Sequence, residues 1–146
     1  MALDRQCKIV LIGDGSVGKS SLIARFRTEG FAPRYHQTVG VDFFEKRLRL
    51  RGAQGVRLQI WDIGGQQTIR TYWRNYFEVT DGLVWVVDSA DRWRLDTCRD
   101  ELKDLLQEEQ LGGASLLIFA NKQDLPDALS VDQIAEHLDL GAPQFK

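Results

Sequence analysis

The sequence predicts an α/β protein with three layers, in which helices cover both faces of a mostly parallel sheet. Two observations lead to this prediction. Short apolar runs that suit strands alternate with stretches of helical periodicity. In addition, the expected strands 41–50 and 56–62 are separated only by the glycine-bearing turn RGAQG, which adds one antiparallel strand. In such sheets ligands bind at the carboxyl ends of the strands, so the chemistry is expected there.

The elements follow one another in a regular order. Nearly continuous apolar runs, typical of strands buried on both faces, are expected to form the central parallel strands 7–13, 81–88 and 115–122. Helical spacing of apolar residues predicts helices after the first strand, around residues 95 to 106, and from about 130 to 140. The pair Gly112-Gly113 is expected to close the second of these helices. Trp85 and Trp93 are expected in or near the core.

Length and composition are those of one globular domain. The chain has 146 residues, 43% of them apolar, and a formal net charge of −2. This charge gives no reason to expect nucleic acid as a partner. Cys7 and Cys98 are isolated, which suits a reducing compartment. Ala2 excludes N-myristoylation and no lipid-anchor motif or apolar span is present, so a cytoplasmic protein is expected, at membranes only through partners.

The segment GDGSVGKSS, residues 13–21, directly follows the first expected strand and opens a helix. It matches the phosphate-binding pattern G-x-x-x-x-G-K-[ST], whose loop N–H groups and helix N-terminus face a phosphate. In this pattern Lys19 reaches the β- and γ-phosphates and the Ser20 hydroxyl binds Mg²⁺. The other residues expected to contact the nucleotide here are Gly13, Gly15, Ser16, Val17, Gly18 and Ser21. A glycine-rich turn without a ligand is the alternative, and the flanking strand and helix argue against it.

The segment WDIGGQ, residues 61–66, ends another strand. Asp62 stands where a carboxylate that holds Mg²⁺ belongs, at the carboxyl end of a strand. Gly65 could offer its N–H to the γ-phosphate, and Gln66 could orient a water for attack and is the candidate catalytic residue. Alone, a strand that ends in Asp and a glycine turn is weak evidence. Its position after the phosphate motif strengthens it.

The segment NKQD, residues 121–124, follows the last expected strand. The Asp124 carboxylate can accept two N–H donors from the guanine edge, which adenine does not offer. The Lys122 stem can lie over the base, and Asn121 can tie this loop to the phosphate loop. A plain polar loop is the alternative for this motif alone, whereas its place in an ordered set of three favours GTP over ATP.

In this order and spacing, the motifs resemble those of the Ras-superfamily small GTPases over about residues 7–140. The resemblance implies the P-loop NTPase fold, GTP or GDP as ligand, and Mg²⁺ held by Ser20, Thr38 and Asp62. Thr38 resembles the switch threonine that completes the Mg²⁺ shell, and Phe31 resembles the aromatic that packs on the base. For both, the alternative is an ordinary loop or core residue.

Within this superfamily the chain resembles two branches. Residues 7–60, with GDGSVGKSS and TVGVDFF, resemble Rab proteins, and residues 61–140, with YWRNYF and LLIFANKQDLPDAL, resemble Arf-like proteins. The second part resembles the Arf-like branch that works with tubulin-folding cofactors and lipid-cargo carriers. Transfer of partners from either branch is therefore unsafe.

Three aromatic residues, Phe43, Trp61 and Tyr76, resemble a triad that Rab and Arf proteins present to effectors. Packing in the core is the alternative, and for Tyr76 the two readings are equally weighted. Partners are therefore expected at the switch regions: effector, exchange-factor and GTPase-activating proteins.

The resemblance implies a guanine-nucleotide switch that hydrolyses GTP slowly and regulates trafficking or tubulin-related processes. One alternative is a nucleotide- or partner-binding protein that does not cycle. The other is a P-loop kinase or ATPase, although these lack an NKQD motif and carry an arginine-bearing lid.

The end of the chain differs from the family pattern. In the family, the helix that ends near Leu140 is followed by a sixth strand, a guanine-contacting loop and a final helix, whereas here only PQFK follows Ala142. The single domain, residues 1–146, is thus expected to lack the last strand and helix. The strand 115–122 would then be an open apolar edge, with lower stability, association and weaker nucleotide binding as expected consequences.

Overall fold

The computed structural model describes residues 5–13, 18–28, 41–49, 51, 55–64 and 76–141. Within these ranges the chain forms one sheet with the strand order β2-β3-β1-β4-β5. The strands are β1 (Arg5–Gly13), β2 (Val41–Leu48), β3 (Val56–Ile63), β4 (Gly82–Asp88) and β5 (Ser115–Asn121). The helices are α1 (Lys19–Thr28), α2 (Leu95–Leu105) and α3 (Val131–His137), with the short 3-10 helices η2 (Arg92–Arg94) and η3 (Glu109–Leu111).

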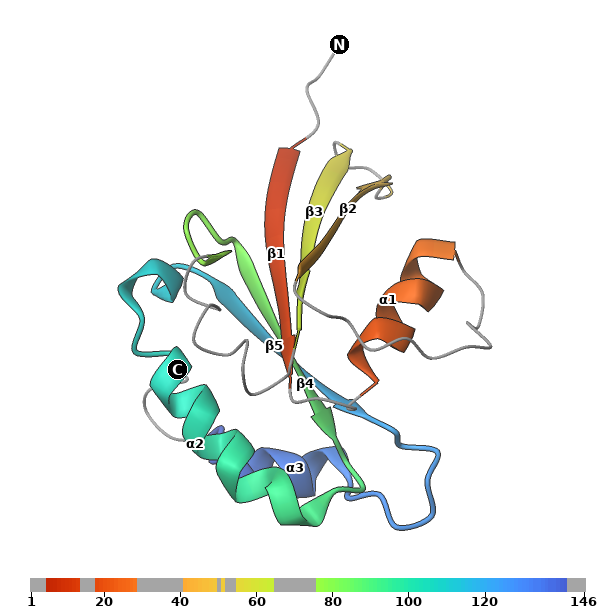
Figure 1. Cartoon of the computed structure of the whole chain (residues 1–146), viewed down its shortest axis with the longest axis vertical. Helices are drawn as coiled ribbons and strands as arrows, with labels where there is room; N and C mark the ends of the chain where they lie inside the picture. Colours follow the sequence, from red (N-terminus) through yellow and green to blue (C-terminus); the bar gives the residue numbers. More distant parts are fainter. Residues whose placement is uncertain are drawn as a thin grey trace.

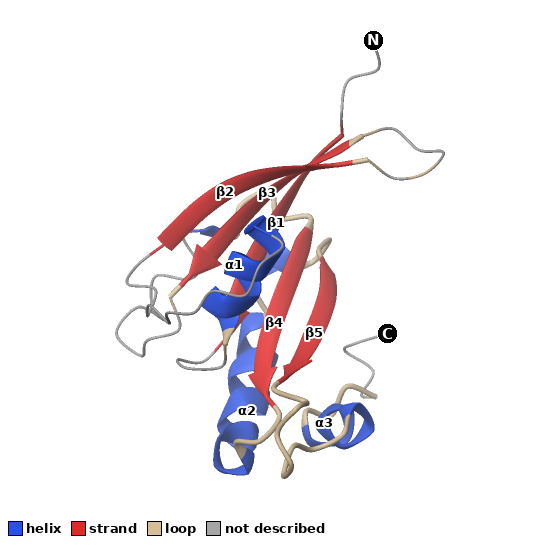
Figure 2. Ribbon diagram, turned by 90° about the vertical axis from the view of Figure 1, so that its right-hand side faces the viewer, coloured by secondary structure: helices blue, strands red, loops and turns tan. Residues whose placement is uncertain are grey.

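The sheet has the predicted mixture of strand directions. β1 pairs in parallel with β3 and β4, and β4 pairs in parallel with β5. β2 is antiparallel to β3, with Phe44 opposite Ile60. The fold-class prediction is therefore confirmed. The four parallel strands run downward in Figure 1, so their carboxyl ends meet at one edge, and Figure 2 shows how the sheet twists from β2 to β5.

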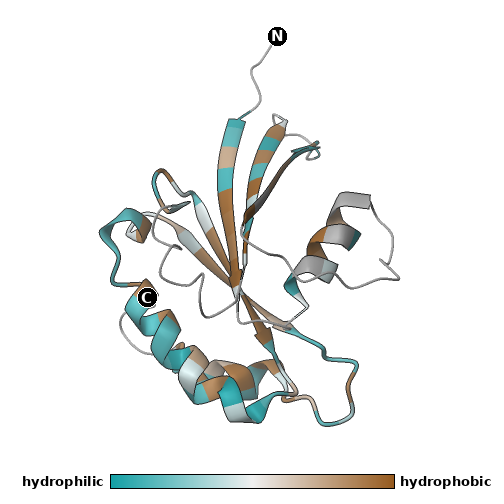
Figure 3. Ribbon diagram, in the orientation of Figure 1, coloured by the Kyte–Doolittle hydropathy of each residue, from teal (hydrophilic) through white to brown (hydrophobic). Residues whose placement is uncertain are grey.

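The helices cover opposite faces of the sheet because successive residues of a strand point to opposite sides. In β1, Val10 and Ile12 belong to the cluster that includes α2 and α3, and Leu11 belongs to the cluster that includes Ile23 of α1. Figure 1 shows the same division, with α1 on one side and α2 and α3 on the other. Figure 3 shows the hydrophobic residues of the strands between these layers and hydrophilic residues over much of α2.

The larger apolar cluster is centred on β4 and α2. Trp85 of β4 is fully buried, and its indole N–H donates to Cys98 Sγ of α2 at 3.0 Å. The expectation for Trp85 is thus confirmed. The expectation for Trp93 is wrong, because this side chain is 95% exposed in η2. Cys7 and Cys98 are both free thiols, as expected.

The end of α2 differs from the prediction. The helix ends at Leu105, and η3 lies between it and Gly112, so the glycine pair follows η3 and does not cap α2. The reason lies at Glu108, whose extended backbone (φ −66°, ψ 125°) interrupts the helical path before the glycines are reached. A capping box at Ser130 starts α3, where Gln133 N–H donates to Ser130 Oγ and Gln133 Oε1 accepts from Ser130 N–H.

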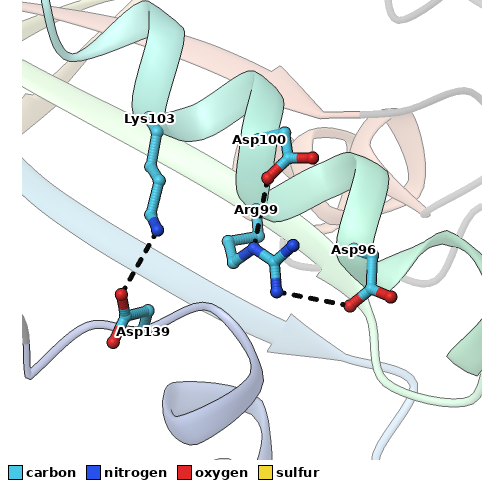
Figure 4. A network of polar contacts seen from close by, with 5 residues as sticks. All are labelled: Asp96, Arg99, Asp100, Lys103 and Asp139. Atoms are coloured by element: carbon cyan, nitrogen blue, oxygen red, sulfur yellow. Dashed lines mark hydrogen bonds and ion pairs between the residues drawn. The ribbon is translucent and has the colours of Figure 1, made fainter.

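An exposed ion-pair network lies on α2 and the turn after α3 (Figure 4). Lys103 reaches Asp139 at 3.2 Å, and Arg99 contacts Asp96 and Asp100 at 3.5 and 3.2 Å. Because these side chains are largely in solvent, each pair contributes little stability. The network nevertheless links the turn after α3 to α2. These two helices also contribute buried side chains to the larger apolar cluster.

β5 is the last strand of the described sheet. Its side chains alternate between half-buried and exposed, and Leu117 and Phe119 are 52% and 42% exposed. These two pair with Val84 and Val86 of β4, so they lie on the same face as α1. Among the described helices, none is long and apolar enough to cross a membrane.

Candidate functional site

The first cluster of candidate residues lies where α1 meets the end of β3. Lys19 is the first residue of α1, and its ammonium group forms an ion pair with Asp62 and donates to the Ile63 carbonyl at 2.5 Å. Both side chains are almost fully buried, at 6% and 3% exposure. Because β1 and β3 are parallel neighbours, the lysine that follows β1 and the aspartate at the end of β3 arrive at the same edge.

Burial has a cost for this lysine. It lowers the pKa of Lys19 below its ordinary value, and the nearby Asp62 carboxylate opposes part of that effect. A buried ammonium group with one carboxylate and one carbonyl oxygen beside it is well placed to interact with a further anion. In a dry site its charge acts more strongly than in water.

The lowered pKa of Lys19 predicts a pH dependence of stability. Between that pKa and the ordinary value for lysine, about 10.4, the unfolded chain binds more protons than the folded one. The free energy of unfolding of the nucleotide-free protein should therefore gain a rising contribution from Lys19 as pH increases through this window. Urea unfolding of the wild-type protein and Lys19→Met, measured from pH 7 to 10.5, should show this rise as a difference between the two curves. Parallel curves would contradict it.

A second contact joins the loop before α1 to the end of β5. Gly18 has φ +88°, a conformation that side chains other than glycine rarely adopt. A Cβ built at Gly18 would also clash with Nδ2 of Asn121. The segment that carries the phosphate motif and the segment that carries NKQD therefore approach each other closely, although Gly18 and Asn121 are 103 positions apart in the sequence.

Lys122 turns sharply away from the strand that precedes it. Its φ is +64°, and its ammonium group is held by Asp88 Oδ2 at 2.8 Å. The other oxygen of Asp88 accepts the Ala90 N–H at 2.9 Å. Asp88 thus fixes both its own turn and the lysine. Asp124, two residues further on, is exposed at the same edge.

Sequence reasoning missed three residues of this region: Asp88, Ser89 and Gln123. A signal was present for the first, because Asp88 is the polar residue that ends the apolar run of β4, and Asp62 stands likewise near the end of β3. No comparable signal marked Ser89 or Gln123. Their importance comes from contacts between distant segments, which are described below.

The structure describes part of the predicted site. It brings Gly18 together with Asn121 and Lys19 together with Asp62. The described predicted residues are Gly13, Gly18, Lys19, Ser21, Asp62, Asn121, Lys122 and Asp124, and for Ser20 the position in α1. The predicted residues outside the described ranges are Gly15, Ser16, Val17, Phe31, Thr38, Gly65 and Gln66.

The three aromatic residues singled out in the sequence form a row. Phe43 and Trp61, cross-strand partners in β2 and β3, have ring centroids 4.6 Å apart, and Tyr76 lies 5.9 Å from Trp61. Phe43 is 40% exposed, whereas Trp61 and Tyr76 are half-buried and pack against the larger core cluster. The row is therefore partly core and partly surface, and its part in effector binding stays a prediction.

Comparison with known proteins decides the family. The model of the Arf (ADP-ribosylation factor) family matches residues 1–144. The chain belongs to this family. Arf-family proteins are small GTPases, nucleotide-binding switches that hydrolyse GTP.

The relatives agree with this assignment. ADP-ribosylation factor-like protein 2 of Drosophila melanogaster is 49% identical over 137 residues, which cover 94% of this chain and 71% of that protein. The protein of the same name from Arabidopsis thaliana is 46% identical with the same coverage. Among solved structures, the Arl6 BBS3 small GTPase of Trypanosoma brucei, with bound nucleotide analogue GppNp, matches with a TM-score of 0.76 and 28% identity, over 92% of this chain and 78% of that one.

The comparisons correct the expectation of a Rab-like N-terminal part. A single Arf-family model spans residues 1–144, so no change of family is supported at residue 61. The reason is that segments such as GDGSVGKSS are shaped by phosphate binding, a task that the branches of the superfamily share. Likeness in such a segment is weak evidence for one branch over another.

Proposed function

We propose that this Arf-family chain is a guanine-nucleotide switch that binds GTP and GDP with Mg²⁺, hydrolyses GTP slowly and acts through effector proteins. One observation carries this proposal: the phosphate motif and the NKQD motif meet at one edge of the sheet, through Gly18 and Asn121. A nucleotide needs its phosphates and its base held at the same time, and this contact brings the two binding segments together.

The phosphates are assigned to the loop before α1 and to Lys19. The backbone N–H groups of the phosphate motif supply uncharged donors, and the N-terminus of α1 adds its positive end. The residues assigned to this role are Gly13, Gly15, Ser16, Val17, Gly18 and Ser21. Lys19 supplies the charge, because its buried ammonium group lies beside Asp62 at the start of that helix. When a triphosphate binds, its oxygens would replace the protein oxygens as hydrogen-bond partners of the Lys19 ammonium group.

Mg²⁺ is assigned to Ser20, Thr38 and Asp62. This donor set of two hydroxyls and one carboxylate fits a hard cation that prefers oxygen ligands and keeps several waters. Within the described part of the chain no cluster of three His, Cys, Asp or Glu side chains could hold a metal by itself, which suits an ion bound mainly through a nucleotide. When bound, Mg²⁺ neutralises the charge that develops on the phosphates.

The base is assigned to Asp124, with Lys122, Asn121 and Phe31 beside it. The exposed Asp124 carboxylate can accept both N–H groups of the guanine edge, which sets the preference for guanine. The Lys122 stem can cover the base, because its ammonium group is anchored on Asp88 at the end of β4.

Hydrolysis is assigned to Gln66, which would orient the attacking water, with Gly65 donating its N–H to the γ-phosphate. The change Gln66→Leu is expected to slow single-turnover GTP hydrolysis about a hundredfold, since it removes a water-positioning group that acts in the transition state. GTP affinity should stay close to that of the wild-type protein. Hydrolysis of radiolabelled GTP by preloaded protein measures this.

The neighbouring substitution Gln67→Leu is the matched control and should leave the hydrolysis rate unchanged. Equal rates in the wild-type protein and in Gln66→Leu would refute the role of Gln66. Stronger displacement of fluorescent GDP by ATP than by GTP would instead favour a P-loop kinase or ATPase. Binding of GTP without any turnover would favour a partner-binding protein that does not cycle.

Protein partners are assigned to the switch regions and to the neighbouring surface that carries the aromatic row. The aromatic row Phe43, Trp61 and Tyr76 offers a partly exposed, rigid apolar contact of the kind that protein partners use. We assign effector, exchange-factor and GTPase-activating proteins to this side of the molecule. We further propose that the switch is cytoplasmic and acts in trafficking or tubulin-related processes, at membranes through its partners.

A further inference from the structure

Ser89, directly after β4, connects three parts of the loop that carries the proposed guanine contacts. Its N–H donates to the Asn121 carbonyl at 3.0 Å, and its carbonyl accepts the Leu129 N–H at 2.8 Å. Its hydroxyl accepts from Gln123 Nε2 at 2.8 Å. Ser89 is fully buried. One residue therefore binds the beginning, the middle and the end of the segment from Asn121 to Leu129.

Gln123 completes this arrangement from the loop side. Its Nε2 group donates both to Ser89 Oγ and to the Leu129 carbonyl, the latter at 2.9 Å. A single amide group thus uses both of its N–H donors, one on Ser89 and one on the end of the loop at Leu129. Two short turns lie between the bridged points, closed by Leu125 N–H to the Lys122 carbonyl and by Ala128 N–H to the Leu125 carbonyl.

The hydrogen bonds of Gln123 affect the position of its neighbour, Asp124. Asp124 follows Gln123 directly and is exposed, so the position of its carboxylate depends on how its backbone is held. The two residues before Asp124 are both held: the left-handed Lys122 fixes the direction of the chain, and Gln123 fixes the loop on Ser89. A carboxylate that must accept two parallel N–H donors tolerates little displacement, since hydrogen bonds weaken steeply as their angles worsen.

The geometry points to Ser89 and Gln123 as positioning residues that set the discrimination of guanine from hypoxanthine. This inference rests on the proposed function. It goes further in assigning a part in base specificity to a buried serine and to the third residue of NKQD, which act through the placement of Asp124. Hypoxanthine lacks the 2-amino group, so its nucleotide IDP offers Asp124 one donor where GDP offers two. Precise placement of Asp124 matters most for the second donor.

The test compares the dissociation constants of GDP and IDP, measured by displacement of fluorescent GDP from the full chain in Mg²⁺ buffer. Gln123→Ala is expected to lower the preference for GDP over IDP about tenfold, the value of one charge-assisted hydrogen bond. Ser89→Ala, which removes only a hydroxyl, should lower it in the same direction by less. The double variant should be no worse than Gln123→Ala, because both changes break the same contact.

Gln133→Ala is the matched control. It also removes a glutamine that bonds to the backbone, at the capping box of α3, yet it lies outside the loop that Ser89 holds. This variant should lose some thermal stability and keep the wild-type ratio of GDP to IDP affinity. The comparison thereby separates a change in base discrimination from a general loss of stability.

The outcomes are distinct. An unchanged ratio in Gln123→Ala and Ser89→Ala, or an equal loss of GDP and IDP affinity, overturns the positioning role while the proposed function stands. Failure of the wild-type protein to prefer GDP over ADP overturns the proposed function itself. If Gln123→Ala does not fold, Ser89→Ala decides the question, because it deletes a single oxygen atom.

Discussion

Replacement of Asp124 by Asn is expected to weaken GDP binding about a hundredfold or more, since a charged, two-point hydrogen bond is lost and one amide N–H would then face a guanine N–H. Xanthosine diphosphate should gain affinity at the same time. Its base carries a carbonyl where guanine carries the amino group, and the new amide N–H can donate to that oxygen. Competition of GDP and xanthosine diphosphate for one fluorescent nucleotide measures both effects.

Asp127→Asn is the matched control for this change. Asp127 lies in the same exposed loop, and the contact recorded for it uses the backbone carbonyl, which accepts from Arg92 and survives the substitution. Its nucleotide preference should equal that of the wild-type protein. An Asp124→Asn protein that keeps its full preference for GDP would remove the base assignment.

Replacement of Gly18 by Ala is the second change with a large expected effect. Alanine at φ +88° is strained, which costs on the order of 1–3 kcal/mol, and the added methyl group would clash with the Asn121 side chain. If this clash moves the two segments apart, the phosphate loop and the NKQD loop can no longer hold the phosphates and the base at the same time. GDP affinity should fall about a hundredfold or more, and the midpoint of thermal unfolding should fall with it.

Gly113→Ala separates the general effect of a glycine substitution from this specific one. Gly113 lies in the turn before β5, its φ is outside the left-handed region, and an added Cβ meets no atom within 4 Å. Stability and GDP affinity should therefore change little. If Gly18→Ala bound GDP as tightly as Gly113→Ala, the contact between Gly18 and Asn121 would have no part in nucleotide binding.

Much of the fold could be predicted from the sequence because its strands are marked by local patterns. The runs that became β1, β4 and β5 are apolar on both faces, and the short turn between β2 and β3 allows only an antiparallel pair. The end of α2 was placed wrongly. Glycines usually close helices, but here the backbone at Glu108 departs from helical geometry first.

Candidate site residues can be proposed from the sequence where a residue type and its spacing are typical of one chemistry, and their roles stay predictions. Lys19, Asp62 and Asp124 belong to this class, and the ion pair of the first two agrees with their expected proximity. Asp88, Ser89 and Gln123 belong to another class. Their side chains act on segments that are more than 30 residues away in the sequence, and only the pairing of β4 with β5 brings those segments together.

Trp93 illustrates a further limit of sequence reasoning. Tryptophan carries the largest apolar surface of any side chain, so a core position was the natural expectation. In the structure it lies in η2 between two arginines and is almost fully exposed. A signal was present in the neighbours along the chain, because Trp85 stands in an apolar run whereas Trp93 is flanked by two arginines.

The central claim is that this chain holds a guanine nucleotide at the edge where Lys19, Asp62, Asn121 and Asp124 gather. The most direct measurement is to denature the purified protein and identify the released nucleotide by chromatography, with fluorescent-GDP uptake measured on the same preparation. We predict about one equivalent of GDP or GTP for each chain, as expected for a single site. Release of adenine nucleotide, or no nucleotide together with no uptake of fluorescent GDP, would contradict the claim.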